Sequence, residues 1–288
     1  MLAYTAPSTV EEAVRALAGA AGNAKVLSGG TDLLVQLRSG RLKADLIVDT
    51  KKIPGIDRIE QRDGGFIIGA ATSGAVIGEH EALRAAWPGV VEAANLIGST
   101  QIQGRASLAG NLCNASPAAD SVPALIAARA TCVVAGAKGQ REVPVEAIVT
   151  GPGRTSLARN ELVVAFHLPK RPPRSADAYL RFIPRTEMDI AVVGVGVNVT
   201  LDASGVCTDA RVVLGAVAPT AVIVADAAKA LIGRKLDDAA LAALDAAARA
   251  ACKPIDDKRG TIAYRTKVAG VLARRTAAIA YQRAGERR

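Results

Sequence analysis

Aromatic and histidine side chains are scarce in this sequence of 288 residues. Aromatic residues make up 3% of the chain, which argues against a surface that stacks nucleic-acid bases. The two histidines are His80, in a polar stretch where we expect it to face solvent, and His167, at the end of an apolar strand. Neither stands near a serine or cysteine in a hydrolase motif, and no H-E-x-x-H or Walker sequence is present. The sequence therefore disfavours a hydrolase, a metalloprotease or a nucleotide kinase.

Cysteines are few and widely spaced, at Cys113, Cys132, Cys207 and Cys252. Because no two form a C-x-x-C pair, the chain by itself is not expected to bind an ordinary iron–sulfur cluster or structural zinc. A disulfide framework is equally unexpected, so we interpret the thiols as reduced, with Cys113 as a packing residue, in a cytoplasmic protein. No apolar run is long enough to predict a transmembrane segment, and the first residues do not resemble a secretory signal.

Positive charge is concentrated near the C-terminus. Residues 249–288 contain 11 Lys and Arg against 3 Asp and Glu, whereas residues 1–248 contain 25 against 24 and are almost neutral. No recognisable nucleic-acid module accompanies this charge, so solvent or an acidic partner subunit explains it better. We therefore expect no nucleic-acid partner.

Two prolines among the basic residues of Lys170–Arg174 mark the clearest boundary in the chain. Before it, a capping-box sequence at Ser8 predicts a first helix to about residue 21. Further helices are expected over about 32–38, 74–84, 89–97 and 121–129, and strands over 25–27, 46–49, 66–70, 131–135 and 161–168. A glycine pair, Gly64-Gly65, predicts a hairpin turn before the strand at 66–70.

Beyond the boundary the pattern changes. Alternating valines predict a strand over about 193–199, which forms a hairpin with 210–218 around the turn Asp202–Gly205. Helices over about 221–232, 237–251 and 259–283 follow. The prediction is an α+β fold with domains at 1–172, divided into lobes of about 1–55 and 56–172, and at 173–288.

Two segments of small and short polar residues, Ser28–Asp32 and Arg105–Asp120, do not fit a core or a solvated helix. The first follows a short strand and leads into a helix that Thr31 can cap, so its backbone N–H groups would face an anion. A backbone with so few bulky side chains can lie against a flat or extended ligand. We infer one large cofactor held by both segments. Gly194-Val-Gly196, by contrast, lies inside an alternating strand and is interpreted as sheet packing.

These segments resemble motifs of a known family, the flavin-binding medium subunits of the molybdenum hydroxylases, which include xanthine dehydrogenases and aerobic carbon monoxide dehydrogenases. Lys25–Leu33 matches the first motif, a strand that leads to a glycine pair and a small polar residue. Ser107–Asn111 matches the second, with Ala109 in place of its first glycine. Asn114–Asp120 continues the match, and Tyr264–Gly270 resembles the C-terminal helix motif.

The resemblance implies a two-lobed FAD-binding domain of the vanillyl-alcohol-oxidase (PCMH) type, followed by a flavoprotein C-terminal domain with an antiparallel sheet and helices. The backbone of Leu27–Leu33 would hold the FAD diphosphate. Arg181 aligns with a basic position near the flavin, where a cation stabilises an anionic reduced flavin; the alternative is a surface strand residue. The residues implied to bind FAD are Lys25, Val26, Leu27, Ser28, Gly29, Gly30, Thr31, Asp32, Leu33, Ala106, Ser107, Gly110, Asn111, Asn114, Ser116, Asp120 and Arg181.

No catalytic residue or metal ligand is assigned to this chain. The family relationship implies partners: a small subunit with two 2Fe-2S clusters and a large molybdenum subunit that oxidises an N-heterocycle, aldehyde, purine or CO, in a dimer of heterotrimers. Thr31-Asp32 favours the heterocycle or aldehyde branches over the carbon monoxide branch. The sequence leaves the reducing substrate and the electron acceptor open. It also leaves two alternatives, a stand-alone FAD-dependent oxidoreductase and a non-enzymatic flavin- or nucleotide-binding partner protein.

Overall fold

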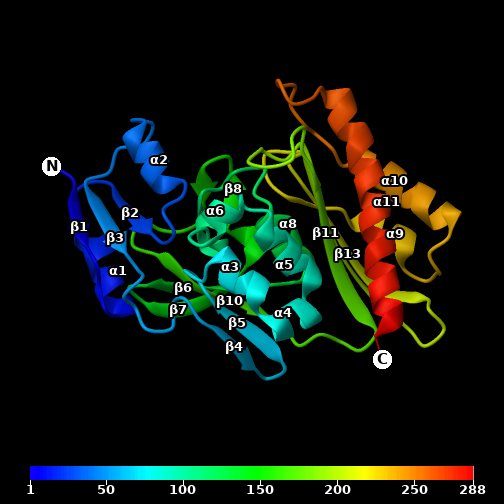
Figure 1. Cartoon of the computed structure of the whole chain (residues 1–288), viewed down its shortest axis with the longest axis horizontal. Coiled ribbons are helices and arrows are strands. Elements are labelled where there is room, and N and C mark those ends of the chain that lie inside the picture. The colour runs from blue at the N-terminus through cyan, green and yellow to red at the C-terminus, as the bar shows by residue number, and fades with distance from the viewer. Residues whose placement is uncertain (288) are drawn as a thin grey trace.

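The computed structural model describes residues 1–287 and begins with a small parallel sheet. Its strands are β1 (Ala3–Thr5), β2 (Ala24–Leu27) and β3 (Leu46–Asp49), with β3 in the centre (Figure 1). Two helices accompany it, α1 (Val10–Gly19) and α2 (Leu33–Arg38). Ala13, Val14 and Leu17 form the buried face of α1.

The cap of α1 lies one residue later than predicted. Thr9 is the N-cap, and its hydroxyl accepts the Glu12 N–H at 3.1 Å. The Glu12 carboxylate in turn accepts the backbone N–H of Ser8 at 2.8 Å, which helps to lower the pKa of Glu12. The capping box therefore begins at Thr9 instead of Ser8, because the acidic residue three positions after the capping side chain is Glu12 rather than Glu11.

A five-stranded antiparallel sheet forms the second part of the molecule, in the order β4-β5-β10-β6-β7. Its strands are β4 (Ile59–Arg62), β5 (Gly65–Gly69), β6 (Thr131–Gly136), β7 (Gly139–Pro144) and β10 (Leu162–Leu168). The β4–β5 turn is Asp63-Gly64, one residue before the predicted glycine pair, and both residues have positive φ. This conformation suits a two-residue hairpin and is the reason that glycine is needed at position 64.

Helices α3 (Gly74–Glu79), α4 (Glu81–Ala86), α5 (Pro88–Asn95), α6 (Thr100–Gln103), α7 (Leu108–Cys113) and α8 (Ser121–Ala127) lie between β5 and β6. Between β7 and β10 stand the short turn Val145–Ala147 and the strands β8 (Val149–Gly151) and β9 (Arg154–Thr155). The helix predicted over 74–84 is divided in two at His80, whose Nδ1 accepts the Leu83 N–H at 3.1 Å. His80 is half-buried against the Phe66 ring, so it faces solvent with only part of its side chain.

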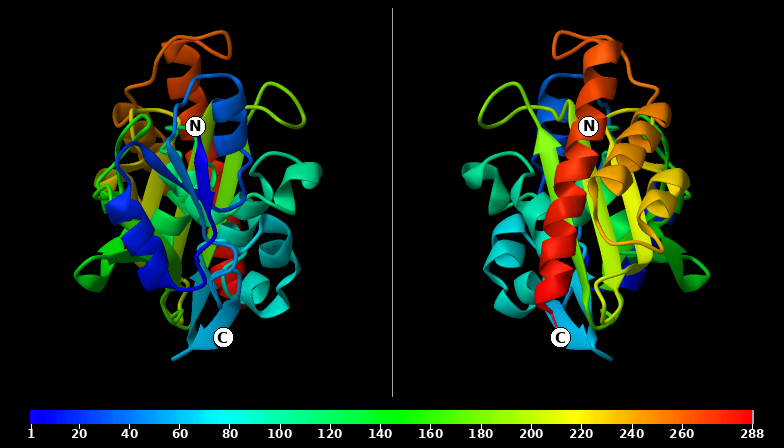
Figure 2. Two further views of the ribbon diagram at one scale, coloured as in Figure 1. Left: turned by 90° about the vertical axis from the view of Figure 1, so that its left-hand side faces the viewer. Right: turned by 90° about the vertical axis from the view of Figure 1, so that its right-hand side faces the viewer.

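A second antiparallel sheet contains β11 (Ser175–Phe182), β12 (Val193–Leu201), β13 (Cys207–Gly215) and β14 (Val222–Ile223), in that order. Helices α9 (Ala225–Leu231), α10 (Asp238–Ala250) and α11 (Ile262–Glu286) cover one face (Figure 2). The predicted 193–218 hairpin is confirmed, with Val197 opposite Val212. A Cβ on Gly194 or Gly196 would overlap Tyr179 or Pro123, which confirms that these glycines serve packing.

Two hydrophobic cores result. One contains residues from α1 to β10 and also Val213, and the other contains residues from β11 to α11. Ala93, Ala124 and Tyr179 form a small cluster where α5 and α8 meet β11. Because α8 packs on β12 and β13, the second sheet is covered on both faces. No helix within residues 1–287 is both long and apolar enough to cross a bilayer.

Candidate cofactor-binding site

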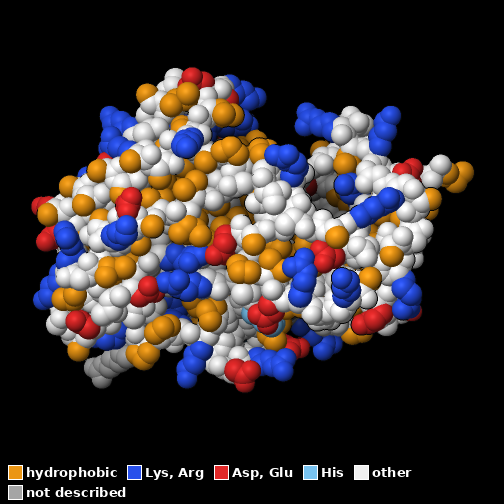
Figure 3. Space-filling model, turned by 180° about the vertical axis from the view of Figure 1, so that it is seen from behind, with side chains coloured by type: hydrophobic (Ala, Val, Ile, Leu, Met, Phe, Trp, Pro, Cys, Tyr) orange, Lys and Arg blue, Asp and Glu red, His pale blue; other side chains and the backbone are white. Residues whose placement is uncertain are grey.

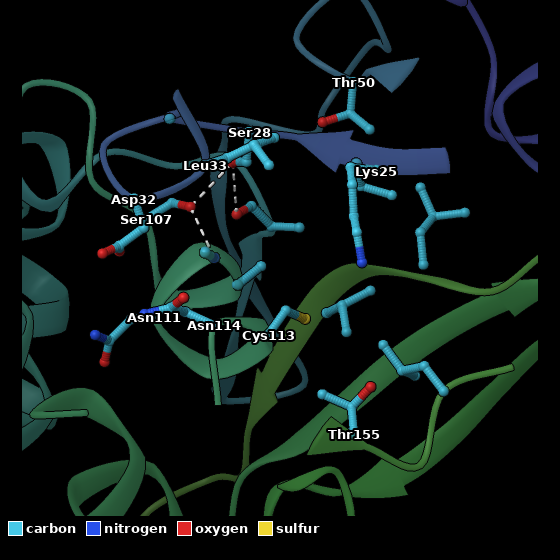
Figure 4. Close-up of a pocket in the computed structure, with 18 of the residues that line it drawn as sticks. Lys25, Ser28, Asp32, Leu33, Thr50, Ser107, Asn111, Cys113, Asn114 and Thr155 are labelled. Atoms are coloured by element: carbon cyan, nitrogen blue, oxygen red, sulfur yellow. Dashed lines mark hydrogen bonds between the residues drawn. The ribbon is translucent and has the colours of Figure 1, made fainter. Parts of the chain in front are cut away.

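A cavity of about 440 Å³ lies where the small parallel sheet meets the helices and strands that follow it. One wall comes from β2, the loop after it and α2 (Figure 4). The opposite wall comes from Ala106–Asn114 and from the segment between β8 and β10. Both sequence segments that we inferred to hold a cofactor therefore reach the same cavity.

The first loop is shaped by its two glycines. A Cβ on Gly29 would overlap the carbonyl oxygen of Arg105, so the close approach of the two loops requires glycine at this position. Gly30 has φ +80°, a conformation that side chains with a Cβ rarely adopt. Within residues 1–287, the backbone N–H groups from Gly29 to Asp32 have no protein acceptor. They are free to donate to a ligand.

The start of α2 differs from the prediction. Thr31 does not cap the helix; Asp32 occupies the N-cap position and makes no side-chain capping bond. Asp32 is an exposed residue at the edge of the cavity, where partial desolvation raises the pKa of its carboxyl. Lys25 extends from β2 into the cavity, and within residues 1–287 its amine has no carboxylate in ion-pair distance (Figure 4). The unpaired amine gives this wall a positive charge.

The second loop is joined to the first by a serine pair. Ser28 Oγ and Ser107 Oγ lie 2.9 Å apart. Ser107 also caps α7, because its Oγ accepts the Gly110 N–H at 3.2 Å. The small residues at this point let the two backbones approach each other. Ala109, Gly110, Asn111 and Cys113 of α7 line the cavity, while Leu108 and Leu112 are buried in the core.

Two asparagines of the second segment are fixed by hydrogen bonds. Asn111 Oδ1 accepts the N–H and the hydroxyl of Ser121, at 3.2 and 2.7 Å. Asn114 Oδ1 accepts from Gln36 Nε2 of α2 at 2.9 Å, which links the two walls. Each amide can therefore present its NH₂ group as a donor.

Most of the predicted site residues line the cavity. Those that do are Lys25, Val26, Ser28, Gly29, Gly30, Thr31, Asp32, Leu33, Ala106, Ser107, Gly110, Asn111 and Asn114. Four predicted residues lie elsewhere. Leu27 is buried behind the loop, and Ser116 Oγ accepts the Ala118 N–H at 3.2 Å. The remaining two, Asp120 and Arg181, contact each other.

The Asp120–Arg181 pair joins α8 to β11. Arg181 Nη1 lies 2.8 Å from Asp120 Oδ2 and 2.7 Å from the carbonyl oxygen of Leu96, while the Tyr179 hydroxyl donates to Asp120 Oδ1 at 2.9 Å. Burial raises the pKa of Asp120 to about 6, although Arg181 and Tyr179 act in the opposite direction. The Arg181 side chain is only 7% exposed, so the alternative of a surface strand residue is wrong. Ile97, next to Leu96, lines the cavity.

Several lining residues escaped the sequence analysis, notably Gln36, Thr155 and Arg159. The Arg159 guanidinium donates to the carbonyls of Ala20 and Gly22, and so fastens the β9–β10 connection to the end of α1. No local motif surrounds these residues, because their role depends on contacts between distant segments. The expectation that Cys113 is a packing residue is wrong, because its side chain is exposed within the cavity.

The arrangement suits binding more than catalysis. Free backbone N–H groups and an unpaired lysine favour an anionic group at one wall, while small residues and asparagines suit a flat polar ligand at the other. A cofactor that combines a diphosphate with planar rings fits this donor set. Within residues 1–287, no three His, Cys, Asp or Glu side chains are grouped so that they could hold a metal ion.

Comparisons with known proteins indicate one family for both the N-terminal and the C-terminal part of the chain. Residues 1–171 match the family described as the FAD binding domain in molybdopterin dehydrogenase, and residues 178–280 match the CO dehydrogenase flavoprotein C-terminal domain. The chain is 31% identical over 281 residues to the 6-hydroxypseudooxynicotine dehydrogenase complex subunit alpha of Paenarthrobacter nicotinovorans, covering 98% of this chain and 95% of that protein. It is 30% identical over 280 residues to the carbon monoxide dehydrogenase medium chain of Hydrogenophaga pseudoflava, covering 97% of each.

A solved structure of the Hydrogenophaga pseudoflava carbon monoxide dehydrogenase superposes with a TM-score of 0.93 and 31% identity, over 98% of both chains. The predicted fold class is confirmed by this match.

Proposed function

The chain belongs to the FAD-binding subunits of the molybdenum hydroxylase family, and on that premise we propose that it is the electron-transfer subunit of a heterotrimeric molybdenum-dependent dehydrogenase. In this role it takes electrons from 2Fe-2S clusters of a small subunit and passes them to an external acceptor. A separate large subunit oxidises the substrate, an N-heterocycle, aldehyde, purine or CO. A dimer of heterotrimers in the cytoplasm belongs to the same proposal.

One observation carries the cofactor assignment: the free backbone N–H groups from Gly29 to Asp32 face a cavity that the second motif also lines. The loop would hold the FAD diphosphate, with the Lys25 amine adding positive charge. Ala106, Ser107, Gly110, Asn111 and Asn114, which line the cavity, would hold the remainder of the cofactor, whereas Ser116 lies outside the cavity. FAD supplies a centre that accepts single electrons and releases them in pairs.

Two further predictions belong to this proposal. The Asp120–Arg181 pair lies behind the segment that contains Ile97, and Arg181 would place its positive charge beside the flavin from there. The division of the chain near residue 172, with the cofactor in the first domain, is supported by the two hydrophobic cores, each formed almost wholly by residues from one side of it, with Val213 as the exception.

The relatives support assignment to the oxidoreductases, and they are consistent with a substrate-binding site on another chain. Their names refer to 6-hydroxypseudooxynicotine and to carbon monoxide, although both proteins are similar to the same flavin-binding chain. A shared subunit with different substrates is expected when the substrate pocket belongs to a partner.

The test is a visible spectrum and metal analysis of the tagged chain purified from its native host without dissociation. We expect flavin absorption, iron and molybdenum in a complex with two further polypeptides. Flavin without metals would contradict the heterotrimer and favour a stand-alone flavoenzyme. A chain that binds no FAD, even after FAD is added, would exclude the cofactor assignment as well.

A further inference from the structure

Five large apolar side chains are exposed together at the end of the second sheet where α11 begins. They are Met188, Ile190, Ile255, Ile262 and Tyr264, with 43% to 69% of each residue accessible. We call them the apolar patch. Single exposed apolar residues are ordinary, whereas a contiguous group marks a surface that contacts another molecule.

The apolar patch is formed by the loop before β12 and by the loop and first turn of α11, and these two segments are held together by side-chain contacts. Asp189, between Met188 and Ile190, accepts from Arg259 Nε at 3.1 Å. The Phe182 and Tyr264 rings meet edge to face, with centroids 6.0 Å apart. Behind them, buried Arg265 donates to the Val192 carbonyl at 2.8 Å. The apolar patch is therefore a preformed surface, which lowers the entropic cost of binding.

Unpaired positive charge surrounds the apolar patch. Within residues 1–287, no carboxylate lies in ion-pair distance of the exposed amines of Lys253, Lys258 and Lys267. Asp189 is engaged by Arg185 and Arg259, and Asp257 by Arg265, whereas the exposed carboxylates of Glu187 and Asp256 have no ion-pair partner within residues 1–287. Basic residues still outnumber acidic ones in the segments 185–190 and 253–267, by six to four. Figure 3 shows basic and apolar side chains together on the projection that this segment forms. The net field favours an acidic partner surface.

A chain of contacts leads from the apolar patch to one wall of the cofactor cavity. Phe182, which touches Tyr264, follows Arg181 in β11, and Arg181 donates to the carbonyl of Leu96. The next residue, Ile97, lines the cavity. A protein docked on the apolar patch would therefore be linked to the cavity wall through Phe182 and Arg181.

We propose that the apolar patch and its lysines form the docking surface for an acidic face of the subunit that delivers electrons to the flavin. The inference rests on the proposed function. An apolar centre with a charged rim is the usual anatomy of a protein–protein interface. A nucleic-acid surface would instead place its cations where the phosphates lie, at the centre of contact.

The experiment compares iron retention by variants of the tagged chain purified from its native host. The patch variant is Ile255→Asp with Lys258→Glu, both at exposed positions of the 252–261 loop. The control is Val76→Asp with Lys138→Glu, which places the same changes at exposed positions on α3 and in the β6–β7 turn. Flavin per chain, circular dichroism, iron per flavin and absorbance at 260 nm are measured for each.

We expect the patch variant to keep its flavin and helix content while iron per flavin falls by about tenfold or more, as at an interface hot spot. The control should match the wild type. A patch variant that retains iron at the wild-type ratio would overturn the inference and leave the proposed function intact. Wild-type chain with flavin but no iron would overturn both. Nucleic acid that is bound by the wild type and lost in the patch variant would assign the surface to phosphate binding instead.

Discussion

At the scale of single residues, the site depends on positions where the surrounding backbone leaves no room for a side chain. Gly29 is such a position, since a Cβ would overlap the Arg105 carbonyl, and the backbone there cannot move without separating the two loops. Gly30 is needed for its positive φ. The loops also lie close enough for Ser28 and Ser107 to form a hydrogen bond. Small changes in this loop should therefore affect both stability and cofactor binding.

Gly29→Ala tests this view. We expect it to lower the free energy of unfolding by about 1–3 kcal/mol, the usual cost of overpacking, and to reduce the flavin content of the purified chain. Urea unfolding and the ratio of absorbance at 450 and 280 nm measure the two effects. Gly19→Ala is the matched control, because a Cβ there meets nothing within 4 Å. Equal behaviour of the two variants would contradict the close-approach argument.

At the scale of elements, buried ion pairs join strand β11 to the segments packed around it. Asp120 of the α8 cap and Arg181 of β11 are one such pair, with side chains 9% and 7% exposed. Arg171 and Asp177 are another, at 2.6 Å, with the Arg171 guanidinium stacked on the Trp87 ring. Burial raises the pKa of Asp177 despite its partner. Such pairs fix the register of packed elements, and removing one partner leaves a charge without compensation.

Asp120→Ala should therefore destabilise the protein by about 3–5 kcal/mol, since Arg181 would stay buried and charged. Asp209→Ala is the comparison. Its salt bridge with Arg129 at 2.8 Å is about half exposed, and its loss should cost no more than about 1 kcal/mol. Chemical denaturation of both variants gives the difference. If both variants lost a similarly small amount of unfolding free energy, the Asp120–Arg181 pair would contribute little to the packing of α8 on β11.

At the scale of the whole molecule, the two hydrophobic cores are not independent. Val213 of β13 belongs to the first core, and α8 packs on β12 and β13. Ala93, Ala124 and Tyr179 continue the contact. A ligand that stabilises the first part should therefore stabilise the second through this shared packing.

Addition of FAD to the chain without its cofactor should raise the temperature of a single unfolding transition. At a free concentration of 100 times Kd, the stabilisation should be about 2.7 kcal/mol, because FAD binds only the folded state. Scanning calorimetry at several FAD concentrations measures it. Two transitions, of which only one moves with FAD, would show that the cores unfold separately.

The sequence by itself determined what local chemistry specifies. The two glycines of the loop at 28–32 indicate its backbone conformation, so its place in the site could be predicted from the residues alone. The 193–218 hairpin followed from alternating valines around Asp202–Gly205, and the long C-terminal helices followed from their periodicity. Shifts of one residue, as at Thr9 and Asp63, arose where two adjacent residues could play the same role.

The tertiary structure decided what depends on distant partners. The bounds of strand β11 were not predicted, although a strand at Arg181 was considered, because the charges of Asp177 and Arg181 mask its apolar pattern until Arg171 and Asp120 compensate them. The accessibility of Cys113 and the exposure of the apolar patch are likewise not encoded locally. Burial and ion pairing are properties of residues far apart in sequence, so only the folded chain could fix which polar groups remain free to bind.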